Sequence, residues 1–503
     1  MTKKKAIILG AAIVAVLVTV LVVVLLVPKG GSKKDDAPAT FDEGIDLKVS
    51  VDGDKMHQAE VVTDKDGNIS NNSYGTLMEY YPANIRDIHI ENKQGSFDVI
   101  SETPEGQATV YTIKGFEDFD LQPGNPDVIA SAAAKLKFTQ VATLDKAKGD
   151  EEFGFDEPRS TVTVTYEDDT KAKIIVGDDA PQGAGTYIRF GTGDAVYLVS
   201  TDTAAVFDYG VNDLISLTVN KPADSVENNE VSEITLSGSG FDQSITLVPN
   251  TDANYSASFR MTAPIERQAS EKESSVIAGC VRGLNADSVK LVNPSDDQLK
   301  TLGLNPPHAK ISAAYPDGQI ELLSSKPDSD GNVFLMVGGG KVVYVIPAAK
   351  VAWSKTGYEA LCSEYALYPK MTALSAVEVK ADGKTYQFTV DSKEVNTTDE
   401  SGIEITRTET NVALGGKSQD LGVFTAFYNK LALIELADAK SDNGSGKQVL
   451  SADYTFADGE TASVEFIDAG GDTYIAKVNG KAVGHASKAN VAAAVSALGD
   501  FKA

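Results

Sequence analysis

The sequence predicts an α+β fold of three duplicated units, each an antiparallel β-meander with a packed helix, placed after one N-terminal transmembrane helix. The first observation is the run from Phe153 to Ser200, in which apolar and polar residues alternate between turns rich in Gly and Asp. The second is that a similar run follows Leu302, and that a more degenerate run reaches the turn at Asp458-Gly459. The third is a helical pattern of apolar residues before each run.

Each unit spans about 145 residues and opens with two strands of the same apolar spacing. The apolar positions of the first strand are Ile85, Ile88 and Ile90, then Val231, Ile234 and Leu236, then Leu374, Val377 and Val379. Those of the second strand are Phe97 and Val99, then Ile245 and Leu247, then Phe388 and Val390. Because the spacings agree in all three units, the pattern indicates duplication.

A helix follows the two strands in each unit, with apolar residues at positions i, i+1, i+4, i+5 and i+8. This spacing makes one broad apolar stripe, which is typical of a helix that packs on a sheet. The stripes are Val128, Ile129, Ala132, Ala133 and Leu136; Val276, Ile277, Cys280, Val281 and Leu284; and Val423, Phe424, Phe427, Tyr428 and Leu431. Asn125 is the expected N-cap of the first helix, with Pro126 at its first position, and the third helix is expected to start after Asp420. A last helix is expected over residues 488–498.

The N-terminal segment predicts a membrane anchor. Residues 6–27 follow three lysines and carry no charge. As a helix they would be about 33 Å long, enough to cross a hydrocarbon core of about 30 Å. A cleaved signal peptide is the alternative, but its apolar region is usually only about 7–15 residues long. We expect an uncleaved span with the head in the cytoplasm and the bulk of the chain on the extracytoplasmic side of the cytoplasmic membrane.

The predicted organisation follows from these segments. It comprises a cytoplasmic head (1–5), a transmembrane anchor (6–27), a tether and polar approach segment (28–80), repeat unit 1 (81–220), repeat unit 2 (231–367) and a degenerate repeat unit 3 (372–503).

The charge balance limits the partners of the folded part. The chain has 72 Asp and Glu against 45 Lys and Arg, a formal net charge of −27. Such a surface repels nucleic acid and anionic headgroups, so nucleic acid is not expected as a partner and the lipid bilayer is expected only through residues 6–27.

The two cysteines, Cys280 and Cys362, leave two interpretations open. Cys280 falls on a predicted apolar helix face as a small buried side chain, or the two thiols form a disulfide.

The sequence offers no catalytic, cofactor-binding or metal-binding residues that we can assign, and we expect a protein that is not an enzyme. None of the four histidines, His57, His89, His308 and His485, stands in a metal-ligand spacing. Gly416-Lys417-Ser418 lacks the first glycine of a phosphate-binding loop. Residues 64–68 and 328–332 resemble calcium loops, but hairpin turns explain them better.

Four tyrosines recur on the predicted meanders and leave two functions open. They are Tyr166, Tyr187, Tyr197 and Tyr344. At strand spacing such rings favour cross-strand packing, whereas an exposed row of them would suit glycan binding.

The motif Phe153-Gly154-Phe155-Asp156-Glu157-Pro158, with Gly177, Tyr187 and Tyr197, has a second copy at 302–307 with Tyr344. Together these features resemble the bacterial family called domain of unknown function 4340, from about Ile85 to Trp353. The third unit departs from the family by lacking the Gly-Pro motif. The resemblance implies a membrane-anchored extracytoplasmic protein, often encoded beside an ABC transporter of the gliding-motility type and a second auxiliary membrane protein. It supplies no catalytic residues.

The first function hypothesis is therefore a non-enzymatic accessory or scaffold protein associated with an ABC-transporter-type complex, with its permease and ATPase subunits as possible partners. The alternative is an envelope module that binds glycan or peptide. A third is a hydrolase whose active site forms from residues distant in sequence.

Overall fold

The computed structural model describes residues 40–41, 45–46, 75–143, 149–169, 171–191, 195–398, 401, 403–442 and 444–501. The predicted head, anchor and most of the tether, with His57 and the segment 64–68, lie outside these residues. Of the helices that the structure describes, none combines the length and apolar character needed to span a bilayer.

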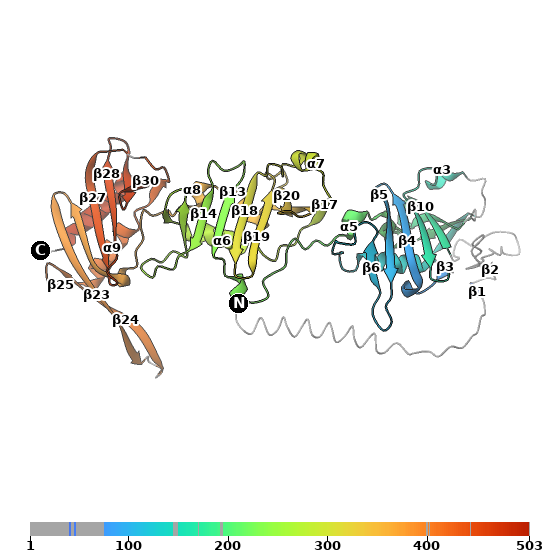
Figure 1. Cartoon of the computed structure of the whole chain (residues 1–503), viewed down its shortest axis with the longest axis horizontal. Helices are drawn as coiled ribbons and strands as arrows, with labels where there is room; N and C mark the ends of the chain where they lie inside the picture. Colours follow the sequence, from blue (N-terminus) through green and yellow to red (C-terminus); the bar gives the residue numbers. More distant parts are fainter. Residues whose placement is uncertain are drawn as a thin grey trace. The chain divides into compact units, whose positions relative to one another are not determined.

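The chain is a mostly β protein with some helices and three large sheets (Figure 1). The predicted α+β class is thus confirmed for its antiparallel sheets, although helices form a smaller share than the class name implies. The chain divides into two compact units. The first contains the described residues up to Lys93, with Ser101–Thr109 and Ala130–Asp208, and the second contains Gln94–Ile100, Val110–Ile129 and the residues from Tyr209 on.

The first large sheet has eight strands in the order β6-β5-β4-β9-β10-β11-β12-β8. Their bounds are β4 (Ile85–Asn92), β5 (Gly95–Glu102), β6 (Val110–Ile113), β8 (Gln140–Thr143), β9 (Ser160–Tyr166), β10 (Lys171–Asp179), β11 (Thr186–Phe190) and β12 (Val196–Val199). This part of the chain also forms two short antiparallel strand pairs. They are β1 (Thr40–Phe41) with β2 (Ile45–Asp46) and β3 (Gly75–Glu79) with β7 (Lys135–Phe138). The helices of this part are α2 (Asn125–Ala134), α3 (Asp150–Phe153), α4 (Thr201–Ala205) and α5 (Val211–Leu214).

The second sheet has nine strands in the order β16-β15-β14-β13-β18-β19-β20-β21-β17. Their bounds are β13 (Glu233–Ser237), β14 (Ile245–Pro249), β15 (Phe259–Ala263), β16 (Arg267–Gln268), β17 (Ser288–Val292), β18 (Ala309–Tyr315), β19 (Gly318–Ser324), β20 (Asn332–Val337) and β21 (Val342–Pro347). Its helices are α6 (Glu271–Gly279), α7 (Asp296–Thr301) and α8 (Tyr358–Leu361).

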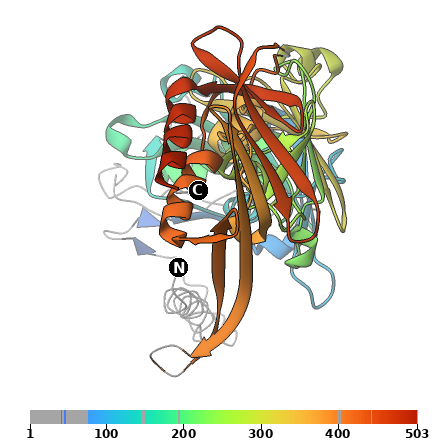
Figure 2. The same cartoon turned by 90° about the vertical axis from the view of Figure 1, so that its left-hand side faces the viewer.

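The third sheet also has nine strands, in the order β25-β24-β23-β22-β27-β28-β29-β30-β26. Their bounds are β22 (Leu374–Ala381), β23 (Lys384–Thr398), β24 (Glu404–Leu414), β25 (Lys417–Gln419), β26 (Leu436–Asp438), β27 (Lys447–Phe456), β28 (Thr461–Asp468), β29 (Thr473–Val478) and β30 (Lys481–Ser487). Its helices are α9 (Leu421–Ala432) and α10 (Lys488–Ala497), and both lie against one face of the sheet (Figure 2). The short 3-10 segments of the chain are Pro82–Asn84, Pro181–Gly183, Val206–Asp208, Glu227–Asn229, Ala348–Ser354, Met371–Ala373 and Leu498–Asp500.

The three sheets share one connection pattern. In each, the first strand lies in the middle of the sheet beside the first strand of the meander, as β4 lies beside β9, β13 beside β18 and β22 beside β27. The strand after the helix then pairs with the last meander strand, as β8 does with β12, β17 with β21 and β26 with β30. The repeated apolar spacings of the sequence therefore correspond to repeated strand positions.

The predicted stripe lies wholly on its helix only in the third unit, because α2 ends before Leu136 and α6 ends before Cys280, Val281 and Leu284. The second, third and fourth positions of α9 are buried, as Phe424, Phe427 and Tyr428 are at most 2% exposed. The first position is exposed in every copy, because Val128, Val276 and Val423 are 43, 41 and 39% exposed. A stripe that includes both i and i+1 is wider than the arc that the sheet covers, so its first residue lies at the boundary with solvent.

The predicted caps are confirmed for the third helix and wrong for the first. The Asp420 carboxylate accepts a hydrogen bond from the Val423 amide at 3.0 Å, as an N-cap does. Asn125 instead begins α2, and its side chain donates to the carbonyl oxygen of Asp213 at 2.7 Å.

The Phe-Gly-Phe motif forms a small second core on the first sheet. Phe153 and Phe155 pack with Val196, and the rings of Phe153 and Tyr187 meet edge to face at 4.9 Å. The second copy repeats this cluster with Leu304, Met336 and Val343. A Cβ on Gly177 would lie 2.1 Å from the carbonyl oxygen of Phe153, so the motif can lie this close to β10 only over glycine.

We predict that Gly177→Ala lowers the free energy of unfolding of the first unit by about 1–3 kcal/mol, because the Phe153 backbone must move away from β10. The measurement is denaturant-dependent hydrogen exchange of the β9 and β10 amides in the full-length protein. Gly149→Ala is the control, since a Cβ there would meet no atom within 4 Å. Equal exchange in the two variants would contradict the prediction.

Candidate functional site

The second and third sheets, which belong to the same compact unit, are joined by a linker that pairs with both. The Ser363 amide donates to the carbonyl oxygen of Gln268 at 3.1 Å, next to a β-bridge between Ala269 and Cys362. One residue later, the carbonyl oxygen of Glu364 accepts a hydrogen bond from the Leu436 amide at 2.7 Å. The linker therefore continues the edge of one sheet into the edge of the other.

A buried arginine crosses this junction. Arg267 on β16 is 7% exposed, and its Nη1 donates to the carbonyl oxygen of Val483 on β30 at 2.6 Å. Ala476 pairs with Gly484 and Lys477 pairs with Ala482, so Val483 is the extra residue of a β-bulge. A bulge leaves its extra residue outside the hydrogen-bond ladder of its own sheet, so the Val483 carbonyl has no partner within the third sheet. Arg267, from the second sheet, supplies that partner.

Two further contacts hold the same pair of sheets together. The buried Asn254 donates from its side-chain amide to the carboxylate of Asp458 at 2.9 Å, in the turn between β27 and β28. The rings of Tyr255 and Phe456 meet edge to face at 5.5 Å. Burial, with help from the nearby Asp252 carboxylate, raises the pKa of Tyr255 to about 12. The junction thus combines charge-assisted, polar and aromatic contacts.

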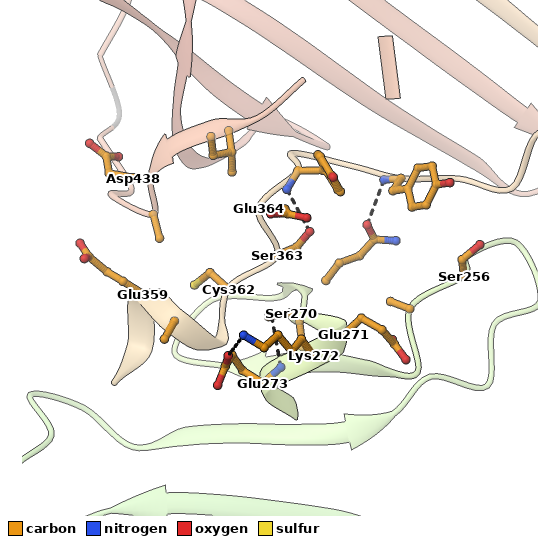
Figure 3. A pocket seen from close by; sticks show the side chains of 18 of the residues that line it. Ser256, Ser270, Glu271, Lys272, Glu273, Glu359, Cys362, Ser363, Glu364 and Asp438 are labelled. Atoms are coloured by element: carbon orange, nitrogen blue, oxygen red, sulfur yellow. Dashed lines mark hydrogen bonds and ion pairs between the residues drawn. The ribbon is translucent and has the colours of Figure 1, made fainter. Parts of the chain in front are cut away.

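A cavity of about 740 Å³ lies at this junction, and we call it the acidic cavity (Figure 3). Its walls come from the residues before and at the start of α6, from α8 with the following linker, and from β26. Figure 3 shows Glu359 and Asp438 at one end of it and Ser256 with Glu271 at the other. The acidic cavity is lined by five carboxylates, Glu271, Glu273, Glu359, Glu364 and Asp438, and by one lysine, Lys272.

The carboxylates of the acidic cavity differ in their partners. Glu271 accepts hydrogen bonds from the amide and hydroxyl of Ser258 at 2.7 and 2.6 Å, and Glu273 lies 3.4 Å from the ammonium group of Lys272. Glu359 is exposed, and its carboxylate makes no hydrogen bond or ion pair with any residue that the structure describes, although its carbonyl oxygen accepts the Cys362 amide at 3.2 Å. The cavity therefore keeps uncompensated negative charge at the end where Glu359 lies.

Asp438 is fixed by the histidine that sequence reasoning left without a role. Nδ1 of His485 lies 2.8 Å from Asp438, and its Nε2 lies 3.3 Å from Asp442. Burial opposes ionisation of Asp438, but hydrogen bonds from His485 and from the Lys440 amide outweigh it and lower its pKa. His485 thus holds the chain that forms one wall of the cavity.

The two cysteines are free thiols, so the disulfide alternative is not observed. Cys362 is buried beside the acidic cavity, and burial raises the pKa of its thiol. Cys280 is only partly buried at the end of α6, where its carbonyl oxygen accepts a hydrogen bond from the indole of Trp353 at 3.2 Å.

Of the other histidines that the structure describes, His89 and His308 lie at separate places. His89 lies on the outward face of β4, 3.2 Å from Glu91, as its strand spacing predicted. His308 lies against Gly240, and burial lowers its pKa. Within the part of the chain that the structure describes, no group of three or more His, Cys, Asp or Glu side chains is placed to hold a metal ion.

The tyrosine row is a packing feature. Tyr166, Tyr197 and Tyr344 are 0, 6 and 7% exposed, so these rings offer no platform for a glycan. The ring of Tyr197 packs on Phe138 at 5.0 Å, and burial raises the pKa of Tyr197 to about 12.

The segments that resemble a phosphate-binding loop and a calcium loop, 416–418 and 328–332, form turns. Gly415 and Gly416, at φ values of 54° and 84°, make the hairpin between β24 and β25, so the segment at 416–418 is not a phosphate loop. The Asp328 carboxylate accepts the amides of Asp330 and Asn332 at 3.0 and 2.8 Å and closes a turn of its own.

Sequence reasoning missed the acidic cavity as a whole. Its residues come from three segments, 256–273, 359–368 and 436–439, and only Cys362 among them had been singled out. The one local signal was the helix start Ser270-Glu271-Lys272-Glu273, in which Ser270 caps α6 through the Glu273 amide. That pattern predicts a helix N-terminus and says nothing of a cavity.

The fold and this cavity define a mostly β protein of repeated antiparallel sheets with a polar site at a sheet junction. Residues 112–289 match the family model described as domain of unknown function (DUF4340). The chain therefore contains a domain of this family, which confirms the resemblance. The matched range includes the Phe153–Pro158 motif but ends before the copy at 302–307. No curated protein and no solved structure matches the chain.

We predict that Arg267→Met lowers the free energy of unfolding of the second unit by about 2 kcal/mol, because a charge-assisted hydrogen bond is lost and the Val483 carbonyl keeps no partner. The measurement is urea unfolding of the full-length protein, followed by the fluorescence of Trp353, which is the single tryptophan and is fully buried.

The matched control is Arg260→Met, which removes the same charge from an exposed ion pair with Glu266 at 3.3 Å. An exposed pair contributes little, so this variant should unfold at the native midpoint. Identical midpoints for Arg267→Met and Arg260→Met would show that the junction contact does not stabilise the fold.

Proposed function

We propose that the protein is a non-enzymatic, membrane-anchored extracytoplasmic scaffold that associates with an ABC-transporter-type membrane complex. The apolar segment 6–27 supports the anchor, and the DUF4340 domain supports the accessory role through the family resemblance. We interpret the three sheets as duplicated units with the bounds 81–220, 231–367 and 372–503. The common strand order of the sheets supports this interpretation.

The observation that carries the proposal is a β-ribbon formed by the outer halves of β23 and β24, residues 391–398 and 404–411. Its strands pair from Asp391 with Asn411 to Thr398 with Glu404. None of its side chains is buried. In Figures 1 and 2 the ribbon extends away from the body of the third sheet.

A ribbon of this kind suits a protein contact. Two strands alone are only marginally stable in water, and their outer edges present unpaired backbone groups that another strand can complete. The sequence from 391 to 411 has six acidic and two basic residues, a formal charge of −4. The expected partner surface is therefore a strand edge flanked by basic residues.

The ribbon can be removed without opening the core. Val390 and Val412, which pair just inside it, are each 4% exposed and belong to the core of the third sheet. Replacing residues 392–410 by Asn-Gly closes the hairpin with a two-residue turn at the same register.

We predict that the full-length tagged protein, crosslinked in cells, recovers permease and ATPase subunits by mass spectrometry. The ribbon-less variant should recover them at about a tenfold lower yield, since each lost factor of ten corresponds to about 1.4 kcal/mol of binding. Its thermal unfolding should match that of the native chain, which separates loss of contact from loss of fold. Equal recovery by both proteins, or a native chain that purifies alone from membranes in gentle detergent, would contradict the proposal.

An envelope module that binds glycan or peptide is the second candidate, and the acidic cavity favours it. A concave site with fixed walls and a few convergent polar groups is the usual form of a ligand site. Its test is saturable binding of isolated cell-wall fragments by the purified full-length protein, with no saturable binding as the contrary result.

A further inference from the structure

The acidic cavity adjoins a second cavity, of about 930 Å³, in the same unit. Glu359, Ala360 and Ala439 line both. The two cavities therefore meet at α8 and at the chain that follows β26, and a ligand longer than one side chain can occupy both.

The second cavity combines an apolar wall with polar residues, and we call it the apolar cavity. The wall comprises Phe241, Ile245, Pro264, Ile265 and Tyr358, and the polar part includes Asp242, Gln243, Glu359, Lys440 and Ser441. Its lysine, Lys440, lies 4.0 Å from Asp438 and so is already near a carboxylate. Apolar and aromatic walls favour an aliphatic or aromatic side chain, because burying such a group releases water from both surfaces.

The negative charge of the acidic cavity favours a positively charged ligand. Its one lysine is paired with Glu273, while the Glu359 carboxylate has no partner among the described residues and Glu364 is exposed next to Tyr365. Burial, with the adjacent Glu364 carboxylate, raises the pKa of Tyr365 to about 12, so this ring stays neutral and adds no charge of its own to the cavity. A cation placed between Glu359 and Glu364 gains attraction from both.

One orphaned polar atom lies on a side chain that lines the acidic cavity. Nε2 of Gln268 is buried without a hydrogen-bond partner among the residues that the structure describes. Buried polar atoms usually have a partner, so this amide group marks a place where an acceptor is missing. The carbonyl groups of a peptide are acceptors that a simple amine does not have.

We infer that the joined cavities form a binding site for an extended peptide segment in which a basic residue lies next to an apolar one. The basic side chain occupies the acidic cavity between Glu359 and Glu364, and the apolar side chain occupies the apolar cavity beside Tyr358. This inference rests on the second candidate function and names the ligand class of that site.

The experiment measures fluorescence anisotropy of labelled hexapeptides with the full-length protein in detergent. The probes are an alternating Lys-Leu peptide, a Lys-Ser peptide that lacks the apolar side chains, and a Glu-Leu peptide of opposite charge. We expect saturable binding of the Lys-Leu peptide, weaker binding of the Lys-Ser peptide and no binding of the Glu-Leu peptide. Glu359→Gln should weaken the Lys-Leu complex about fivefold, and Glu359→Gln with Glu364→Gln about tenfold.

The control is Glu230→Gln, an exposed carboxylate that lines neither cavity, and it should bind as the native chain does. Since Glu359 and Glu364 are both exposed, their variants should also unfold at the native temperature. Equal affinity of the native and double-variant proteins for the Lys-Leu peptide would overturn the inference, as would equal binding of the Glu-Leu peptide. If cell-wall fragments bind saturably to the native chain while the Lys-Leu peptide does not, the inference fails and the second candidate function stands.

Discussion

A buried arginine side chain crosses from the second sheet to the third and forms the centre of the junction between them. Taking a guanidinium group out of water is costly unless its donors find acceptors. Arg267 finds one in the carbonyl oxygen of Val483, which a β-bulge leaves outside its own ladder. Nη2 of Arg267 also donates to the carbonyl oxygen of Ser363 at 3.4 Å. The contact with Val483 therefore relieves the cost of the unpaired carbonyl and part of the cost of the buried charge. The walls of the acidic cavity come from segments of both sheets that this contact joins.

Local periodicity explains why so much of the fold was predictable. Ile85, Ile88 and Ile90 are all buried on β4, and their counterparts Val377 and Val379 are buried on β22. A strand with one buried face repeats every two residues, as Ile88 and Ile90 do, and a register shift after Ile85 keeps Ile85 on the same face at a spacing of three. This spacing is visible in the sequence itself. The predicted burial of Val128, Val276 and Val423 is wrong at all three positions for the same reason. A helical wheel gives the direction of a side chain but not the width of the surface that covers it.

The junction and its cavity could not be predicted for a different reason. Arg267 and Val483 are more than 200 residues apart, and nothing in the sequence around either one records the pairing. His485 had been assigned no role, yet it fixes Asp438 in the cavity wall. Only tertiary structure brings such residues together, and each of them has an ordinary local environment in the sequence.

The Arg267 contact, together with the Asn254 and Tyr255 contacts, holds the second and third sheets in one fixed arrangement. The most direct test is pulsed electron paramagnetic resonance on spin labels at Glu233→Cys on β13 and Lys447→Cys on β27, two exposed positions, after Cys280→Ala and Cys362→Ala. We expect a single narrow distance distribution, which broadens when Arg267→Met is added. A broad distribution with Arg267 in place would show that the two sheets are not held in one arrangement.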